Sequence, residues 1–467
     1  MSVNHFTVPE SQQNSLQDGV LVAWYGDDFT GAAAVMEVLE FAGLPSMLFL
    51  DVPTQVQLER YPNLRCIGVA STARTQSPSW MDEQLPRVYE QLKQLNPALV
   101  HYKVCSTLDS SPHTGSIGRA IEIASNHFSS SVVPVLVAAP QMRRYQCFGH
   151  LFAGVGDEVI RLDRHPVMAH HPVTPMDESD VARHIAKQSE RLDVDFLSLE
   201  ALTAGIESLN LKEYSLDDQL SVVTLDCMDT STESAVGRLI WQGRSQNHFV
   251  VGSQGVEYAL VQYWQDSEQL QAVKPPGSIG PSTGMVAVSG SVSPTTAEQI
   301  SWSCRNGFSG ITLDAVKVCT GEKEAEIERV VNQSLAALEA GQDPIVYTAE
   351  GPGDPAVARF KEAISSSGCN ISEANQTIGE TLGRVLKKVL QESGVRRAVV
   401  SGGDTSGHAT QQLGIFALSA LSPTIPGAAI FRAHADGPMD GLELALKGGQ
   451  MGSPDYFGWV RSGGGLR

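Results

Sequence analysis

The sequence predicts an α/β protein of two domains, each with a mostly parallel sheet flanked by helices. Short apolar runs typical of buried strands alternate along the chain with segments of helical periodicity, an order that implies parallel crossovers. A stretch rich in Pro, Gly and Ser at residues 271–284 has no periodicity and is typical of a linker. We therefore expect one domain over residues 20–270 and a second over residues 285–467.

The composition is that of an ordinary soluble globular protein, with 42% hydrophobic and 18% charged residues in a chain of 467. The formal net charge of −19 argues against nucleic acid or an anionic membrane surface as a partner, because the chain lacks a broad basic field. No apolar run reaches the roughly 18 residues that a membrane span requires. An anionic substrate would need local cations or Mg²⁺ to hold it.

The first residues and the cysteines indicate a cytoplasmic protein. Residues 1–19 are polar and lack the basic flank and apolar centre of a signal peptide, so we expect a disordered leader there. The seven cysteines are an odd number, are scattered, and form no C-x-x-C pair. This pattern disfavours both a disulfide framework and a structural zinc site, as suits a reducing compartment.

Two adjacent acids follow the first expected strand. The segment VLVAWYGDDFTGAAAVMEVLEFAG, from Val20, predicts a strand, then Asp27 and Asp28, then a helix from Ala32 to about Phe41. Ligands of open α/β sheets bind at the carboxyl ends of strands. The alternative is that the acids cap the helix, but a cap needs one acid, and two neighbouring acids repel each other. The pair therefore favours a functional site.

Cations come to the same edge of the sheet from later strands. Further strands are expected within residues 46–52, 66–75, 99–112 and 132–140, with a helix at about 117–124. The 66–75 segment ends at Arg74, and the next strand leaves Lys103, Thr107 and Asp109 at its end. Each cation alone is more often the solvated end of an element than a ligand group. At successive strand ends, Arg74 and Lys103 together favour a pocket for a carboxylate.

Residues 141–174 are rich in Gly, Pro, Arg and His, which predicts irregular hairpins lying over the sheet. The candidate side chains in this segment are Arg143, Arg164, His165, His170 and His171. The two arginines and the first histidine could reach a substrate. A metal site from the three histidines is disfavoured, because there is no H-E-x-x-H pattern and neighbouring histidines in a Pro-rich loop are usually polar surface. We assign no residue as a metal ligand.

The second half of the chain repeats a strand, a small-residue turn and a helix. The arrangement occurs at residues 248–264, again from 285, and most clearly at 397–418, where a helical pattern starts at Thr405 and extends toward residue 418. A glycine turn and the free N–H groups of a helix start suit a phosphate. Asp404 is unexpected there, because a carboxylate repels phosphate unless a metal lies between them or it holds the loop or a ribose hydroxyl. The alternative is an ordinary helix N-cap.

Three such turns belong to the second domain. They are Ser289-Gly290-Ser291, Gly402-Gly403 and Lys447-Gly448-Gly449, the last after a short stretch that we expect to be helical. A parallel sheet would gather them at one edge, as in a nucleotide site. The chain has neither the G-x-x-x-x-G-K-[ST] nor the G-x-G-x-x-G pattern, so a nucleotide would have to bind through another scaffold.

Taken in order, these motifs resemble those of the four-carbon acid sugar kinases, a family long described as a domain of unknown function. Residues 26–32 resemble the family's A-D-D-L-T-G-A opening, and SGGDTSG at 401–407 resembles its other signature. Residues 103–107 stand where the family has K-x-x-S-T, Arg74 where it has an arginine after the third strand, and Ser289 in its V-S-G-S turn. The similarity covers nearly the whole chain after residue 20.

The resemblance implies a kinase whose N-terminal domain binds a sugar acid, whose C-terminal domain binds nucleotide, and whose active site lies in the cleft between them. It implies ATP- and Mg²⁺-dependent phosphorylation of the terminal hydroxyl of threonate, erythronate, an oxo-tetronate or a related acid. By position, the substrate residues would be Asp27, Asp28, Arg74, Lys103, Val104, Cys105 and Ser106, with Arg164 as a further candidate. The ATP residues would be Ser289, Gly402, Gly403, Asp404, Thr405 and Gly449.

Three departures from the family pattern bear on the substrate. The acids are preceded by Tyr-Gly where the family usually has Ala, and KGGQMG at 447–452 replaces K-S-G-N-F-G. Together with the segment from residue 141 to 175 and with Cys105 inside the K-x-x-S-T site, they suggest a branch whose substrate need not be a tetronate. Phosphoryl transfer is better supported than any particular acceptor.

Phosphoryl transfer requires an anion cradle, a metal, and a carboxylate that accepts the proton of the attacking hydroxyl. We expect Asp28 to be this base and Asp27 to orient the substrate or bind Mg²⁺, although the sequence alone does not rank the two. Arg74 and Lys103 would hold the substrate carboxylate.

Two other classes of protein remain open. The first is a non-catalytic, nucleotide-gated protein that binds or senses a small acid on the same fold, against which the retention of both acids argues. The second is an oxidoreductase, which the missing dinucleotide fingerprint disfavours. The expected partners are a small-molecule acid and no nucleic acid or membrane, with a homodimer left open.

Overall fold

The computed structural model describes residues 16–171, 173–204, 209–216, 219–367 and 370–467. The strands of the N-terminal half are β1 (Val22–Gly26), β2 (Ser46–Phe49), β3 (Cys66–Ala70), β4 (Leu99–Lys103), β5 (Val133–Leu136), β6 (Arg144–Cys147), β7 (His150–Val155), β8 (Glu158–Arg161), β9 (Leu192–Leu197), β10 (Leu220–Leu225) and β11 (Phe249–Gly252). Those of the C-terminal half are β12 (Val286–Ser289), β13 (Phe308–Thr312), β14 (Asp343–Tyr347), β15 (Arg397–Ser401), β16 (Ile415–Ser422), β17 (Ile430–Ala435) and β18 (Glu443–Lys447).

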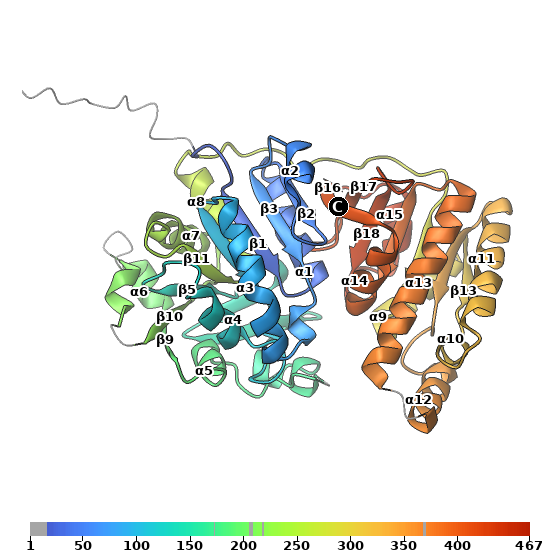
Figure 1. The fold of residues 1–467 in the computed structure, drawn as a ribbon, viewed down its shortest axis with the longest axis horizontal. Coiled ribbons are helices and arrows are strands. Elements are labelled where there is room, and N and C mark those ends of the chain that lie inside the picture. Colours follow the sequence, from blue (N-terminus) through green and yellow to red (C-terminus); the bar gives the residue numbers. More distant parts are fainter. Residues whose placement is uncertain (1–15, 172, 205–208, 217–218, 368–369) are drawn as a thin grey trace, which may run out of the picture.

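Helices flank the strands in both halves (Figure 1). The N-terminal helices are α1 (Phe29–Phe41), α2 (Gln55–Glu59), α3 (Pro78–Gln94), α4 (Ile117–Ala124), α5 (Val181–Ala186), α6 (Leu199–Ala204), α7 (Thr230–Gly243) and α8 (Gly255–Asp266). The C-terminal helices are α9 (Pro294–Cys304), α10 (Ala315–Cys319), α11 (Lys323–Glu339), α12 (Pro355–Ser367), α13 (Ile371–Ser393), α14 (Gly403–Gln412) and α15 (Tyr456–Arg461). Among the described residues, no helix has both the length and the apolar character needed to cross a bilayer.

One sheet of 15 strands runs through the described parts of both halves. Its order is β13-β14-β12-β15-β18-β17-β16-β2-β3-β1-β4-β11-β5-β10-β9. The pairs from β2 to β9 are parallel, as are those from β13 to β18, and the antiparallel pairs of this sheet all involve β16 or β17. The predicted α/β class with mostly parallel sheets is therefore confirmed, and the two expected sheets are edge-to-edge parts of one.

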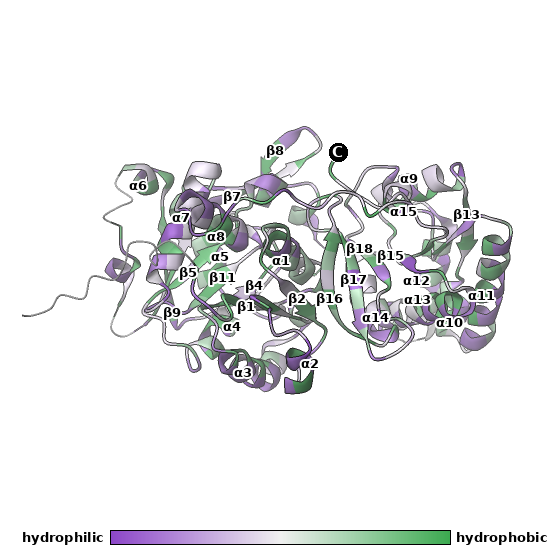
Figure 2. Cartoon of the chain, turned by 90° about the horizontal axis from the view of Figure 1, so that it is seen from above, coloured by the Kyte–Doolittle hydropathy of each residue, from purple (hydrophilic) through white to green (hydrophobic). Residues whose placement is uncertain are grey.

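Apolar side chains cover both faces of this sheet. One core contains residues from both halves, among them Trp24 of β1 and Leu382 of α13. Separate cores cover the other face, one around Tyr89 in the N-terminal half and one around Tyr456 in the C-terminal half. In Figure 2 strands such as β11 and β16 are green, as expected for a sheet that is covered on both faces.

Two local predictions in the C-terminal half were wrong. The stretch before Gly448, expected to be helical, is the strand β18, because it lies between β15 and β17 and its apolar residues are buried. The helix expected to extend toward residue 418 ends at Gln412, and the chain turns at Gly414, with φ of +71°, into β16. In both places sheet pairing outweighs a helical apolar pattern that spans only a few residues.

The irregular segment after residue 141 contains the hairpins that its composition predicts. Strands β6, β7 and β8 form a separate antiparallel sheet of three strands beside the main sheet. Residues 271–284 contain no helix or strand and pass from one half to the other (Figure 1). Most of the expected leader, residues 1–15, lies outside the described residues.

The two halves are also joined by a buried carboxyl group. Glu37 of α1 is 7% exposed, and its Oε2 accepts hydrogen bonds from the backbone N–H groups of Gly427 and Ala429, with N–O distances of 3.1 and 3.3 Å. Both donors belong to the turn between β16 and β17. Burial raises the pKa of Glu37 to about 8, so the carboxyl group is largely protonated at neutral pH.

We expect Glu37→Ala to lower the free energy of unfolding by about 2–4 kcal/mol, because two buried N–H donors lose their acceptor. Glu37→Gln keeps an acceptor and should be milder. The wild type gains stability from the raised pKa below about pH 4.5 and loses it as the pH rises through about 8. Denaturant unfolding at pH 5 and pH 9 should therefore show the Gln variant gaining relative to the wild type at the higher pH. Equal losses for both variants at both pH values would contradict this account.

Candidate active site

Asp27 and Asp28 follow β1 directly and have different environments. Asp28 is the N-cap of α1: its carboxylate accepts hydrogen bonds from Gly31 N at 3.2 Å and from Thr30 Oγ1 at 2.7 Å. The capping role that the sequence left open therefore describes Asp28. Asp27 makes no such cap, and its Oδ1 is buried without a hydrogen-bond partner among the described residues. A buried oxygen without a partner requires an explanation, and a role in catalysis is one such explanation.

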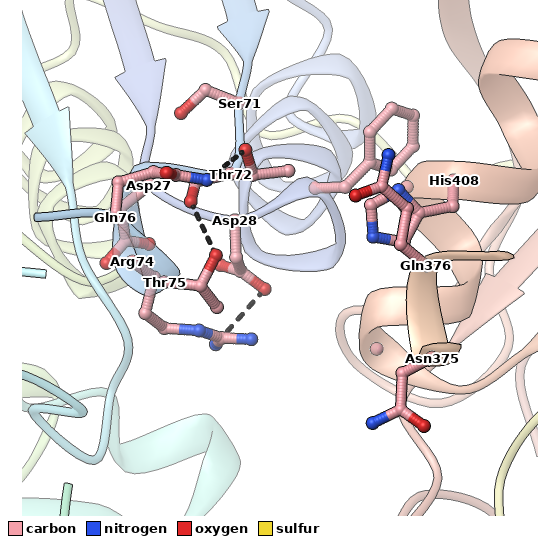
Figure 3. Close-up of a pocket in the computed structure, with 13 residues that line it drawn as sticks. Asp27, Asp28, Ser71, Thr72, Arg74, Thr75, Gln76, Asn375, Gln376 and His408 are labelled. Atoms are coloured by element: carbon pink, nitrogen blue, oxygen red, sulfur yellow. Dashed lines mark hydrogen bonds and ion pairs between the residues drawn. The ribbon is translucent and has the colours of Figure 1, made fainter. Parts of the chain in front are cut away.

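Both predicted cations contact this pair, and Figure 3 shows Arg74 beside Asp28. Lys103, at the end of β4, places Nζ 2.8 Å from Asp28 Oδ1 and 4.0 Å from Asp27 Oδ1. Arg74 Nη1 lies 3.3 Å from Asp28 Oδ2 and 3.9 Å from Asp109 Oδ2. The arrangement follows from the strand order, because β1 lies between β3 and β4 and the three strands end at one edge.

These contacts separate the proton affinities of the two acids. Burial raises the pKa of Asp27 to about 7, and the neighbouring negative charge of Asp28 adds to this rise. Burial alone would also raise the pKa of Asp28, but Arg74 and Lys103 outweigh it and hold that pKa well below its usual range. Asp28 is thus a permanent anion, whereas Asp27 can take up and release a proton near neutral pH.

The close approach of Lys103 to Asp28 depends on a glycine. A Cβ built at Gly31 would overlap both Lys103 Nζ and Asp28 Oδ1. The first turn of α1 therefore leaves room for the ion pair only when position 31 has no side chain.

The acids line a cavity to which both halves contribute. The N-terminal half supplies Asp27, Asp28, Phe29, Ser71, Thr72, Arg74, Thr75 and Gln76, and the C-terminal half supplies Asn375, Gln376, Gly403, Gly407 and His408. Figure 3 shows the two groups on opposite sides, with α13 and α14 bringing the second. Two polar walls that come from different halves make this a cleft site.

A larger cavity of about 1560 Å³, counted with its open mouth, lies in the C-terminal half. The turns after β12, β15 and β18 all reach its wall, at residues 290–291, 402–403 and 449, as the sequence predicts for neighbouring strands. The rest of the wall is mostly apolar and includes Phe360 and Ile378. Bare amides at one end and an apolar slot at the other fit a nucleotide, whose phosphates and base need these two surfaces.

The glycines of these turns are required by geometry. Gly402 has φ of +123°, a conformation that side chains with a Cβ rarely adopt. A Cβ at Gly290 would overlap Thr405 Oγ1, and one at Gly449 would overlap Ser291 Oγ. The turns therefore pack so closely that positions 290 and 449 have no room for a side chain.

The two cavities share part of their walls. Asn375 of α13 and Gly403, the first residue of α14, border both the cleft with the acids and the cavity with the glycine turns. A group transferred from a ligand in one cavity to a ligand in the other would pass this shared wall.

Comparison with known proteins agrees with this division. A family model for a sugar-binding N-terminal domain matches residues 22–260, and one for a nucleotide-binding C-terminal domain matches residues 286–457. A 3-oxo-isoapionate kinase of Paraburkholderia graminis is 41% identical over 95% of both chains. The chain belongs to the four-carbon acid sugar kinase family.

More distant members extend the same likeness. A 3-oxo-tetronate kinase of Pseudomonas savastanoi is 25% identical over 94% of this chain and 96% of its own. A solved structure from Haemophilus influenzae, of the DUF1537 family, has a TM-score of 0.68 at 23% identity, covering 94% of this chain and 99% of its own, which supports the fold. This member of the four-carbon acid sugar kinases is thus a small-molecule kinase with a sugar-binding N-terminal domain and a nucleotide-binding C-terminal domain.

The remaining predicted substrate residues of this kinase differ in how much of each is exposed to solvent. Val104 is 1% exposed and donates its backbone N–H to Gly252 O. Cys105 and Ser106 are partly exposed beside the acids, with Cys105 Sγ 3.0 Å from Thr107 Oγ1. Arg164 is exposed in the turn after β8, and no ion pair is recorded for it. Lys103 of this motif therefore contacts the acids, but residues 103–107 are not among those that line the cleft, and Arg164 lies at the surface.

One predicted nucleotide residue, Ser289, does not border the cavity in the described structure. Ser289 is fully buried beneath its turn, where its Oγ accepts a hydrogen bond from Ser291 N. Its neighbour Ser291 lies on the wall instead. The side chain of Asp404 lies outside the described residues.

The side chains of the insertion have local roles. His165 Nδ1 accepts from the backbone of residues 167 and 168, and His171 Nδ1 accepts from that of Thr174. Arg143 donates to the carbonyls of residues 156 and 158. Within the described residues, no group of three His, Cys, Asp or Glu side chains could hold a metal ion.

One residue under the nucleotide cavity has an environment that the sequence did not indicate. Lys447, at the end of β18, is fully buried, and Nζ donates to Gly448 O at 3.0 Å and to Thr296 Oγ1 at 3.4 Å. Thr296 in turn donates to Ser291 Oγ on the cavity wall, at 3.0 Å. Burial lowers the pKa of Lys447 to about 7, and no carboxylate among the described residues pairs with it. Two hydroxyl groups, those of Thr296 and Ser291, therefore link the amine to the expected position of the phosphates.

We expect Lys447→Met to stabilise the nucleotide-free kinase by about 1–4 kcal/mol at pH 6, because it removes a charge buried without a partner. The folded pKa lies below the unfolded value of 10.5, so this gain should be largest below about pH 7 and should fade as the pH rises toward 10.5. The same variant should bind ADP more weakly.

Thermal unfolding between pH 6 and pH 10 and calorimetric titration with ADP measure these two effects. Lys361→Met is the matched control, because Lys361 borders the same cavity but is exposed. A Lys447→Met protein that is less stable than the wild type at pH 6 would contradict the account.

Proposed function

We propose that the protein transfers the terminal phosphoryl group of Mg·ATP to the terminal hydroxyl of a 3-oxo sugar acid, with 3-oxo-isoapionate as the first candidate. The observation that carries the proposal is the shared wall at Asn375 and Gly403, which joins a cavity with a base to a cavity with a phosphate cradle. The substrate class rests on the 41% identical relative named for 3-oxo-isoapionate and on the relatives named for 3-oxo-tetronate.

Asp27 is the general base in this proposal. It would accept the proton of the substrate hydroxyl while that oxygen attacks the terminal phosphorus and ADP leaves. A carboxylate with a pKa of about 7 and a free buried oxygen suits this task better than one fixed by two cations. The assignment of the base to Asp28, made from the sequence, stays a prediction, and we propose instead that Asp28 positions Lys103 and Arg74.

The donor set fits a magnesium ion that enters with the nucleotide. Mg²⁺ prefers oxygen ligands and is usually held by phosphates and water with few protein groups. The hydroxyls of Ser291 and Thr405 border the cradle and are such groups. When bound, Mg²⁺ would neutralise charge on the phosphates, while the backbone amides of the three turns would hold their oxygens.

A panel of sugar acids incubated with Mg·ATP tests the function directly. Substrate-dependent release of ADP, with the phosphate located on the product by ³¹P NMR, is the expected result for 3-oxo-isoapionate. Binding of acid and nucleotide without ADP release would instead support the non-catalytic sensor.

The roles of the two acids predict different pH profiles. We expect kcat/KM of the wild type to rise as the pH increases through about 7, because the deprotonated form of Asp27 is the base. Asp27→Asn should lose about 100-fold or more in kcat, and its pH profile should lack this rise, which we call the acidic limb. Asp28→Asn should move the limb to lower pH, because a negative neighbour that raises the pKa of Asp27 is removed.

Steady-state kinetics of both variants between pH 5 and pH 9 distinguish the assignments. Loss of the limb in Asp28→Asn together with its retention in Asp27→Asn would return the base to Asp28. Circular dichroism of both variants checks that the fold is retained.

A further inference from the structure

The cations beside the acids already have carboxylate partners. Lys103 faces Asp28 and Asp27, and Arg74 faces Asp28 and Asp109. Two positive charges therefore meet three carboxyl groups before any substrate enters. A sugar acid brings a further negative charge, which in a partly buried site requires a cation that is not yet paired. This argument rests on the proposed function, because only an acid substrate creates the requirement.

Arg144 is a partly buried cation of this kind. It is the first residue of β6, and its recorded side-chain hydrogen bonds all come from Nη1, which donates to the carbonyl oxygens of residues 142, 143 and 154 at 3.1, 3.3 and 3.4 Å. Its Nε is buried and has no hydrogen-bond partner among the described residues. No carboxylate in the described part of the chain forms an ion pair with it within 4.0 Å. Nε is therefore a donor for which the described residues supply no acceptor.

The main chain places Arg144 at the edge where the substrate strands end. Arg144 forms an antiparallel bridge with Ala139, with N–O distances of 2.9 and 3.2 Å, and Ala139 follows the carboxyl end of β5. Strand β5 belongs to the same parallel set as β1 and β4. The strand ends that carry Asp27, Lys103 and Arg144 therefore lie along one edge.

The electrostatic surroundings of Arg144 point to the same space. Burial lowers the pKa of Arg144, while Cys105 and Asp109 act on it in the opposite direction, so both lie near its guanidinium. Asp109 also faces Arg74 at 3.9 Å. Arg144 and Arg74 thus approach the loop after β4 together, and the half-exposed Cys105 lies within that loop.

We propose that Arg144 binds the carboxylate of the sugar acid through the Nε and Nη2 edge of its guanidinium. The planar fork of arginine matches the two oxygens of a carboxylate, and fixation of Nη1 by three carbonyl groups orients the fork in advance. Lys103 and Arg74 then hold the acids in place, and Arg144 selects acids over neutral sugars. Through Arg144, the three-stranded sheet of β6, β7 and β8 would contribute a side chain to the active site.

Arg144→Gln with Arg143→Gln as its matched control tests the proposal. Arg143 is the adjacent arginine, but it donates to carbonyls of its own hairpin. We expect Arg144→Gln to raise KM for the sugar acid substrate about 10- to 100-fold, which is the range for a lost hydrogen bond to a charged group. The change in kcat should be much smaller. Arg143→Gln should leave KM within about twofold, as is usual for a residue that does not contact substrate.

Inhibition by erythronate and by its neutral amide separates charge recognition from a structural role. The wild type should bind erythronate more tightly than the amide, and Arg144→Gln should lose most of this preference while binding the amide as before. Equal weakening for both compounds, or a fall in thermal stability that accounts for the loss, would overturn the proposal. Arg144→Lys, which keeps the charge without the fork, should recover part of the preference.

The outcome is distinguishable from failure of the proposed function. Release of ADP by the wild type with a sugar acid tests the kinase reaction alone. A wild type that phosphorylates the acid while Arg144→Gln keeps its KM and its preference for erythronate would refute the role of Arg144 and leave the kinase assignment standing. A wild type that releases no ADP with any acid, but whose preference for erythronate depends on Arg144, would refute the kinase reaction alone.

Discussion

The antiparallel pairing of β16 with β2 is the constraint on which the site depends. It joins two parallel sheets edge to edge, so that in the hydrogen-bonded ladder the strands of one half run opposite to those of the other. In a flat sheet, the carboxyl ends of β1 and β15 would then lie at opposite edges. Six strand-to-strand steps separate them, and at roughly 20–25° of twist a step the sheet turns by about 120–150°. The twist brings both strand ends to one cleft.

Buried ionisable groups mark the places where the two halves act together. Glu37 joins the two halves, Asp27 lines the cleft, and Lys447 lies under the glycine turns. Burial raises the pKa of the two carboxyl groups and lowers that of the amine, so that it favours the neutral form of each group. Each group costs folding free energy in the charged state. For Lys447, the phosphates of a bound nucleotide would bring the compensating charge, whereas Glu37 and Asp27 reduce the cost by holding a proton.

Sequence reasoning found the parts of the site that depend on strand ends. Asp27, Arg74 and Lys103 follow apolar runs, and parallel strands place such residues along one edge, so their meeting was predictable. It could not rank the two acids, because their difference arises from contacts 2.8 to 4.0 Å long between residues far apart in the chain. Arg144 was passed over for its neighbour, because which of two adjacent arginines faces inward depends on the register of a hairpin.

The sequence likewise predicted some features of the fold and missed others. The alternation of apolar runs and helical periods predicted the α/β class and the glycine turns. It did not predict β18 or the β16–β17 hairpin, since a few residues of mixed pattern fit either structure and the sheet decides between them. The joining of the sheets could not be seen from any single segment, because it depends on a pairing between residues 48–49 and 417–418.

The small sheet of β6, β7 and β8 stands apart from this framework. Its backbone pairs with the rest of the described chain only through isolated bridges at residues 144, 146 and 150, although Leu151 and Ala153 of β7 pack in the N-terminal core, and it contributes no strand to the large sheet. Its loops can lengthen, shorten or exchange side chains without breaking the ladder that holds the acids and the phosphate cradle. Descendants of one ancestral gene could therefore acquire new acceptors while inheriting the transfer chemistry unchanged, and their divergence would concentrate in this one stretch.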